Sequence, residues 1–243
     1  MILRMNIQTR PVEYTHNSTL LEGFFAYPED RSQPLPTILI SHAWAGRDEF
    51  VCDKARALAK MGYAAFALDM YGKDVRGKNQ EQNAKLMHPF IEDRTLLQAR
   101  ITAALETVRH LPEVEAKRIA AIGFCFGGLC VLDLARTGAD LRGVVSFHGL
   151  FYSPGNTQGI RIRAKVLALH GYDDPMVPPD QILALAKELT EAGADWQIHA
   201  YGNTVHAFTN PKANDPSFGT VYNPTADHRS WQSLGNFLAE VLN

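Results

Sequence analysis

The sequence predicts an α/β fold in which helices cover both faces of a twisted, mostly parallel sheet. Short runs of consecutive apolar residues alternate with longer segments of helical periodicity along nearly the whole 243-residue chain. Strands without an alternating polar face are typical of parallel sheets that are buried on both sides. The chain has no internal repeat and no linker-like change in composition, so we expect a single domain over residues 1–243.

Apolar runs and helix boundaries define the elements expected in the first half of the chain. The expected strands are two within residues 5–27, one at 37–42 and one at 63–69. The expected helices are 48–61 and 95–110. In the first helix Val51, Ala55 and Leu58 recur near the helical period, and Gly62 follows as a stop signal. We expect the segments 28–36 and 70–92, which are polar, to be irregular.

The same alternation continues through the second half of the chain. The expected strands are 118–124, 141–147, 165–170 and 196–201. The expected helices are 126–137, 178–191 and 230–242. We expect 150–163 and 207–228 to be irregular loops. Because ligands bind at the carboxyl ends of the strands in such sheets, a functional site is expected in the loops that follow the strands.

The composition excludes several classes of protein. The net charge is −2, with 46% hydrophobic and 21% charged residues, which is a globular balance without a strong field for nucleic acid or an anionic membrane. The chain has no apolar run of roughly 18 residues and no signal-peptide core near its start, and its three cysteines form no disulfide framework, so we expect a cytoplasmic protein. Because H-E-x-x-H, Walker A and G-x-G-x-x-G motifs are absent, we expect neither a metal nor another cofactor.

The stretch Gly123-Phe124-Cys125-Phe126-Gly127-Gly128 joins an expected strand to an expected helix. The pattern G-x-C-x-G puts a thiol at the apex of the turn, as in the nucleophile elbow of α/β-hydrolases with sulfur in place of the serine oxygen. The glycines are required because side chains beside the strained apex would collide with neighbouring backbone. The amino terminus of a helix favours the thiolate. The alternative is a structural cysteine in a buried turn.

A carboxylate and a histidine follow two later strands, at the positions of a catalytic acid and base. Asp174 lies in the turn after one strand, with Asp173 as its rival and a turn-forming carboxylate as the structural alternative. His206 lies in the loop after the last strand, where the alternative is a solvated surface histidine. The chain order Cys125, Asp174, His206 is the nucleophile–acid–base order of α/β-hydrolases. We therefore predict that these three residues form a catalytic triad.

The chain resembles the dienelactone hydrolase family, also described as carboxymethylenebutenolidase-like proteins. The resemblance covers most of the chain and rests on four segments, G-F-C-F-G-G at 123–128, L-D-M-Y-G at 68–72, H-G-Y-D-D-P-M-V-P at 170–178 and V-H-A-F-T-N-P at 205–211. It implies a single domain with the α/β-hydrolase fold, no metal, and a triad that maps onto Cys125, His206 and Asp174.

The residue types predict hydrolysis of an ester or lactone through a covalent thioester. His206, oriented by Asp174, takes the proton of Cys125, and the thiolate attacks the carbonyl carbon. We expect the backbone N–H groups of Phe126 and Trp44 to form the oxyanion hole. His206 then protonates the leaving oxygen and activates the water that hydrolyses the thioester.

Two positions of the expected substrate pocket depart from the family's prototype. The prototype has a glutamate at the position of Ala43 and an arginine at the position of Asn210. We therefore expect a less charged pocket, to which Tyr71, His148 and Phe208 contribute, and a substrate with an apolar acyl or aryl group. Because an oxyanion hole also suits a phosphoryl oxygen, we expect promiscuous hydrolysis of activated aryl esters and of uncharged phosphotriesters.

Two other functional classes stay open. A thiol-based redox protein would use Cys125 as its reactive thiol, with Cys52 and Cys130 as small core residues. A non-catalytic binding protein for a small molecule would need no oriented base. The expected partner is a small-molecule ester, lactone or triester, without nucleic acid or membrane. We expect a monomer, with a dimer as the alternative.

Overall fold

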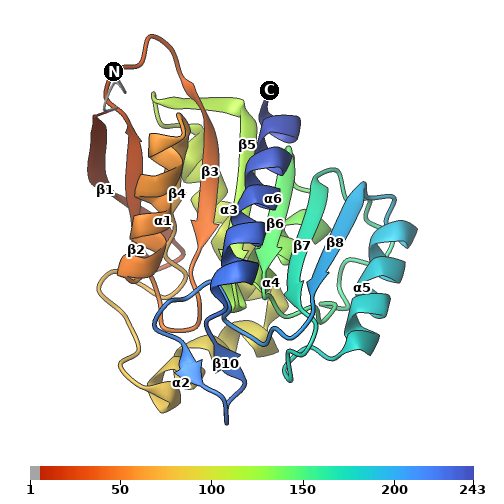
Figure 1. Ribbon diagram of the computed structural model, residues 1–243. Coiled ribbons are helices and arrows are strands. Elements are labelled where there is room, and N and C mark those ends of the chain that lie inside the picture. The colour runs from red at the N-terminus through yellow and green to blue at the C-terminus, as the bar shows by residue number, and fades with distance from the viewer. Residues whose placement is uncertain (1–5) are drawn as a thin grey trace. The chain divides into compact units, whose positions relative to one another are not determined.

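The computed structural model describes residues 6–243, so what we expect of residues 1–5 lies outside the described part of the chain. The predicted α/β fold is confirmed, because eight strands form a mixed, mostly parallel sheet and six helices accompany them within residues 6–243 (Figure 1). The chain divides after Ala121 into two compact units. Strand β5 (Val114–Phe124) runs across that boundary. The single domain stays a prediction.

The first unit carries the antiparallel edge of the sheet. Its strands, in the order β1-β2-β4-β3-β5, are β1 (Ile7–His16), β2 (Thr19–Pro28), β4 (Ala64–Ala67), β3 (Leu35–Ser41) and the start of β5. β2 pairs antiparallel with β1 and β4, whereas β3 and β4 are parallel. Helix α1 (Glu49–Lys60) packs on β2, β3 and β4, and α3 (Arg94–Arg109) packs on β1. Both helices match the predicted ones.

The second unit continues with parallel strands. Its strands β6 (Gly143–Phe147), β7 (Lys165–Gly171) and β8 (Trp196–Tyr201) pair in chain order. Helix α4 (Phe126–Arg136) packs on β6, and α5 (Pro179–Glu191) lies beside β8 at the right of Figure 1. Helix α6 (Pro224–Leu242) packs on β6 and β7. Asp174 therefore lies in the loop after the carboxyl end of β7, and His206 lies in the loop after the carboxyl end of β8.

The expectation that residues 70–92 are irregular is wrong for the second half of that segment. Helix α2 covers Gln80–Glu92, and the side chain of Asn79 caps it by accepting a hydrogen bond from the Gln82 N–H at 2.9 Å. Only Asn83 and Phe90 of this helix are buried among the described residues. Since α2 presents almost no apolar face to a core, the periodicity that predicts a helix is missing from its sequence.

The expectation that residues 207–228 form one long irregular loop is also wrong. It contains a short hairpin of β9 (Asn214–Asp215) and β10 (Thr220–Val221), and α6 begins at Pro224, before the predicted start at Ser230. The Asn223 side chain caps α6 by accepting from the N–H groups of Thr225 and Ala226, each at 3.1 Å. Asparagine followed by proline is a helix-start signal, whereas strands of two residues are too short to leave a pattern.

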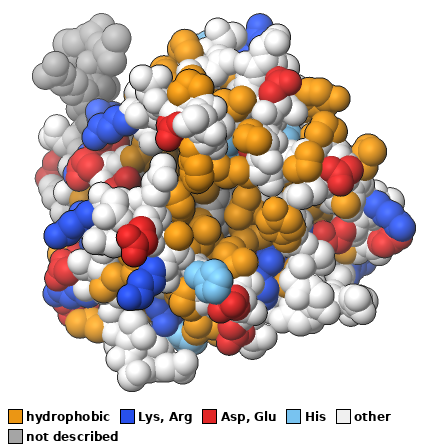
Figure 2. All heavy atoms as spheres, turned by 90° about the horizontal axis from the view of Figure 1, so that it is seen from below, with side chains coloured by type: hydrophobic (Ala, Val, Ile, Leu, Met, Phe, Trp, Pro, Cys, Tyr) orange, Lys and Arg blue, Asp and Glu red, His pale blue; other side chains and the backbone are white. Residues whose placement is uncertain are grey.

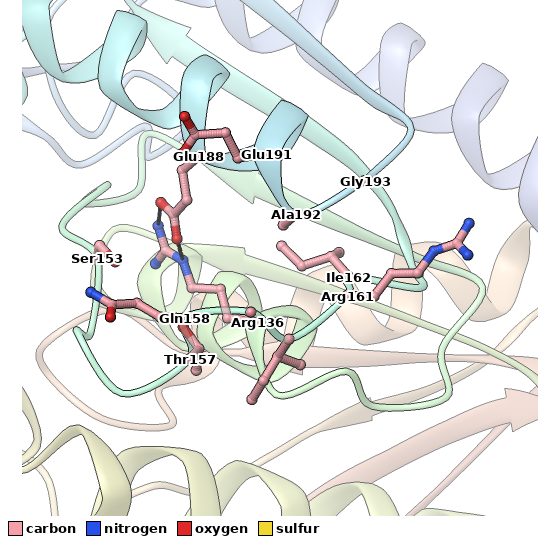
Figure 3. A pocket seen from close by; sticks show the side chains of 12 residues that line it. Arg136, Ser153, Thr157, Gln158, Arg161, Ile162, Glu188, Glu191, Ala192 and Gly193 are labelled. Atoms are coloured by element: carbon pink, nitrogen blue, oxygen red, sulfur yellow. Dashed lines mark hydrogen bonds and ion pairs between the residues drawn. The ribbon is translucent and has the colours of Figure 1, made fainter.

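The segment 150–163 is irregular, as predicted, and its beginning is fixed by a buried arginine. The guanidinium of Arg136 donates to the carbonyl oxygens of Phe151 at 3.0 Å and Tyr152 at 3.2 Å. It also forms a two-point ion pair with Glu188 of α5, with both N–O distances at 2.8 Å (Figure 3). Arg136 thereby ties the start of this loop to α4 and α5.

None of the helices within residues 6–243 combines the length and the apolar character that a helix needs to cross a bilayer.

Candidate active site

Cys125 occupies a strained turn between β5 and α4. Its backbone has a φ of 55° and a ψ of −118°, outside the regions that non-glycine residues prefer. Its N–H donates to the Phe147 carbonyl at 3.0 Å, which ties the turn to the end of β6. A Cβ atom at Gly123 would lie 1.9 Å from the Gly127 carbonyl oxygen, so this close approach requires glycine. The elbow geometry predicted from the sequence is confirmed.

Asp174 and His206 form a buried hydrogen-bonded pair. The Nδ1 atom of His206 lies 2.7 Å from Oδ2 of Asp174, and both side chains are almost fully excluded from solvent. The other oxygen of Asp174 accepts the N–H of Met176 at 2.9 Å. Asp173 instead accepts the N–H of Thr204 at 3.2 Å. Of the two neighbouring carboxylates, Asp174 is therefore the one that meets the histidine.

His206 is placed to carry a proton at neutral pH. Burial disfavours its charged form, but the negative charge of Cys125, the hydrogen bond to Asp174 and the charge of Asp174 together raise the pKa of His206 to about 10. Its Nε2 atom is buried and makes no hydrogen bond of standard geometry with the described residues. Cys125 acts on the ring mainly through its charge, which is the largest of the effects that raise the pKa of His206.

The β9–β10 hairpin holds the backbone of His206. The N–H of His206 donates to the Gly219 carbonyl at 3.0 Å, and its own carbonyl accepts the N–H of Val221 at 3.2 Å. Gly219, at a φ of 73°, also packs against Pro175, the residue after Asp174. The sequence gives no signal for this support, because a hairpin with two-residue strands has no periodicity.

Other predicted residues of the second unit are largely buried. Phe126 is the first residue of α4, and Phe208 packs its ring against His148 and Tyr201, with centroids 5.1 Å and 5.6 Å away. The side chain of Asn210 accepts the N–H of Lys212 at 3.0 Å within its own turn. Their contact with a substrate stays a prediction.

The predicted residues of the first unit gather after β3 and β4. The hydroxyl of Tyr71 donates to the Trp44 carbonyl at 3.0 Å, next to Ala43 in the same loop. The Tyr71 ring also meets the His42 ring edge-on, with centroids 4.8 Å apart. The assignment of Trp44 to the oxyanion hole and of Ala43 and Tyr71 to the pocket stays a prediction.

Figure 2 views the side on which β10 lies in Figure 1, and hydrophobic side chains are exposed in that view. Among the second unit's residues, Tyr172 is 50% exposed and Phe218 is 37% exposed. Tyr172 lies two residues before Asp174, and Phe218 precedes Gly219 of the hairpin. One exposed aromatic side chain is therefore close to the acid in the chain, and the other is next to the glycine that holds the backbone of the base.

The pocket in Figure 3 is not lined by the residues of the predicted triad. It is lined by the loop from Ser153 to Ile162, the end of α5 and the Arg136–Glu188 ion pair, and its lining includes none of Cys125, Asp174 and His206. Across the described residues, no group of three or more His, Cys, Asp or Glu side chains is arranged to hold a metal ion.

Comparison with known proteins adds an independent observation. The profile of the Dienelactone hydrolase family matches residues 21–242. A carboxymethylenebutenolidase-like protein of Aquifex aeolicus is 29% identical over 241 residues, which cover 95% of this chain and 98% of that protein. Protein usf of Aquifex pyrophilus is 27% identical over 242 residues, which cover 95% of this chain and 98% of that protein.

Solved structures show the same similarity. The crystal structure of a dienelactone hydrolase-like promiscuous phosphotriesterase from metagenomic libraries superposes with a TM-score of 0.92. It is 37% identical in sequence, and the match covers 98% of this chain and 99% of that one.

Proposed function

The chain belongs to the dienelactone hydrolase family, and from this premise we propose that it hydrolyses esters or lactones through a triad of Cys125, His206 and Asp174. The observation that carries the proposal is the buried 2.7 Å hydrogen bond between His206 and Asp174, in a ring whose pKa depends on the charge of Cys125. A protein that only binds a small molecule has no need of an oriented base beside a strained thiol.

In the first half of the reaction the Cys125 sulfur attacks the carbonyl carbon of the substrate. A C–S bond forms, and the carbonyl electron pair moves onto oxygen to give a tetrahedral oxyanion. When that pair returns, the bond to the leaving oxygen breaks, and the proton on His206 passes to this oxygen. Asp174 stabilises the imidazolium before the transfer and holds the Nδ1 atom of His206, so that Nε2 is the nitrogen left for the reaction. The products are an alcohol or phenol and an acyl thioester on Cys125.

In the second half His206 acts as the base. Its imidazole is now neutral, so it takes a proton from water while the hydroxide attacks the thioester carbon. Collapse of the second tetrahedral intermediate breaks the C–S bond, releases the carboxylic acid and returns Cys125 to the thiolate. The proton gained by His206 restores the starting pair.

The oxyanion needs donors that are fixed before the reaction begins. Phe126 follows Cys125 directly and opens α4, so its N–H belongs to the positive end of the helix dipole. We propose this N–H as one donor. The N–H of Trp44 stays the predicted second donor.

The proposed substrate class rests on a missing arginine and on two exposed aromatic side chains. Asn210 stands where the family's prototype has a carboxylate-binding arginine, and its amide is used within its own turn. Tyr172, two residues before Asp174, and Phe218, next to Gly219 of the hairpin that holds His206, expose aromatic surface. We therefore propose esters or lactones with an apolar acyl or aryl group.

A second activity is proposed from the comparison with the promiscuous phosphotriesterase, which shares 37% identity over 98% of this chain. The same thiolate can attack phosphorus in an uncharged triester, so that a P–S bond forms while the bond to the aryl leaving group breaks and His206 protonates the departing oxygen. Water activated by His206 then cleaves the P–S bond, which releases a phosphodiester and returns the thiolate. The oxyanion donors then bind the phosphoryl oxygen. Without a charged substrate to neutralise, this step needs no metal.

Steady-state hydrolysis of p-nitrophenyl butyrate and diethyl p-nitrophenyl phosphate tests both activities. The wild-type protein is compared with Cys125→Ala and with Cys130→Ala, a buried cysteine of α4, in the presence of a chelator. We expect the first variant to lose both activities and the second to keep them. Retention of either activity by Cys125→Ala, or its loss on chelation, would contradict the assignment for that substrate. Peroxide turnover that survives His206→Asn would favour a redox protein instead.

A further inference from the structure

The proposed triad leaves one neighbour of His206 without a role. We propose that His148, hydrogen-bonded to Thr209, is a positioning residue that keeps the imidazole of His206 turned toward Cys125. The inference rests on the proposed function, because it assigns a role within the same site.

His148 is held rigidly at the end of β6. Its backbone has a φ of 36°, a left-handed conformation that is uncommon for a residue with a side chain. Its N–H donates to the Leu169 carbonyl of β7 at 2.8 Å, and its side chain is almost fully buried. A strained conformation of this kind persists only where the surrounding structure determines it, and such positions cluster at functional sites.

Thr209 connects His148 to the segment that carries the base. The Nε2 atom of His148 lies 2.8 Å from the Thr209 hydroxyl, and both residues are buried. Thr209 is three residues after His206 and is reached through Ala207, which also has a positive φ, of 58°. The hydrogen bond therefore fixes the chain directly behind His206 to the end of a central strand.

The ring of His148 also touches the ring of His206. The two centroids are 5.2 Å apart with an interplanar angle of 65°, an edge-to-face contact. On its other sides the His148 ring meets Phe208 at 5.1 Å and Phe124 at 6.1 Å, so it has little freedom to rotate.

This contact supplies a restraint that Asp174 does not. A single hydrogen bond at Nδ1 fixes one atom of the His206 ring but leaves the ring free to swing about that bond. A rigid neighbour packed against the ring limits the swing, and with it the direction in which Nε2 points. Because a displacement of about 1 Å costs on the order of a hundredfold in rate, such a restraint has a measurable effect.

The chain offers a matched pair of variants at Thr209. Thr209→Val keeps the shape of the side chain and removes the hydroxyl, whereas Thr209→Ser keeps the hydroxyl. His148→Phe keeps a ring of similar size and removes the nitrogen. Two quantities are measured, the kcat and KM for an aryl ester, and the rate at which iodoacetamide alkylates Cys125 at pH 7, with Cys125→Ala as the blank. Circular dichroism and thermal melting check the fold.

We expect Thr209→Val and His148→Phe to lower kcat by about tenfold to a hundredfold, with KM changed by less than about threefold. We expect both to slow alkylation of Cys125, because a displaced imidazolium no longer supports the thiolate, and Thr209→Ser to restore both quantities. If the Val and Ser variants behave alike, or if Thr209→Val changes neither quantity, the inference is overturned. Should His148→Phe not fold, the two Thr209 variants decide. If the wild-type protein hydrolyses no ester, the proposed function fails, and the alkylation rates still test the positioning role.

Discussion

Gly219 lies so close to Pro175 that a Cβ atom at Gly219 would be 2.2 Å from the Cγ atom of the proline ring. Pro175 directly follows Asp174, and the carbonyl of Gly219 accepts the N–H of His206 at 3.0 Å. A single residue of the β9–β10 hairpin thus contacts the loop of the acid and the backbone of the base. We therefore expect the hydrogen bond between Asp174 and His206 to depend on this packing.

Gly219→Ala is expected to disturb that packing, and Gly155→Ala is its control. Both glycines have a positive φ, of 73° and 75°, so an added Cβ costs each about 1–2 kcal/mol of backbone strain. Nothing lies within 4 Å of a Cβ at Gly155, whereas Gly219 meets Pro175. We expect Gly219→Ala to lose at least as much stability as Gly155→Ala. We expect kcat/KM to fall tenfold or more in Gly219→Ala alone. Equal activity in the two variants would show that the hairpin does not position the pair.

Asp174→Asn is expected to separate catalysis from folding. An asparagine keeps the shape of the side chain but removes the charge that supports the imidazolium of His206. We expect kcat to fall on the order of 10²–10⁴. Asp173→Asn, which weakens only the contact with the Thr204 N–H, should stay within about threefold of the wild-type rate. A larger loss of activity in the Asp173 variant than in the Asp174 variant would show that Asp174 is not the catalytic acid.

The free energy of unfolding should depend on alkaline pH through His206. Its pKa is raised from 6.5 to about 10, so the folded protein binds this proton more tightly than the unfolded chain. That contribution is complete below about pH 6.5 and is lost as the pH rises through about 10. Urea unfolding at pH 7 and at pH 10.5 should therefore show a loss of stability. The loss should be smaller in Cys125→Ala, which lacks the charge that raises the pKa; an equal loss in both proteins would contradict the thiolate–imidazolium pair.

The sequence reveals the parts of the site that depend on local patterns. The elbow at Cys125 is recognisable because its glycines and its thiol have fixed spacing, and Asp174 and His206 each follow an apolar strand. The sequence does not decide between Asp173 and Asp174, because the two carboxylates are adjacent in the chain. The folded loop separates them, since Asp174 meets His206 and Asp173 meets the Thr204 N–H.

The parts that escape prediction depend on distant or weak signals. The His148–Thr209 hydrogen bond joins residues 61 positions apart, and although Thr209 lies in the segment 205–211 that carries the family resemblance, nothing in the sequence pairs it with His148. Helix α2 is mostly exposed and so lacks an apolar stripe, and the β9–β10 hairpin is too short to show periodicity. The expected cytoplasmic location and monomeric state stay predictions.

The most direct test of the account is the mass of the protein during turnover. Wild-type protein is mixed with excess p-nitrophenyl butyrate, quenched in acid within the first turnovers and digested, and Cys125→Ala is treated in parallel. We predict a butyryl group on the peptide that contains Cys125, formed together with up to one equivalent of p-nitrophenol, and no such adduct in the variant. A butyryl group on another residue, or hydrolysis by Cys125→Ala at the wild-type rate, would contradict the thioester mechanism.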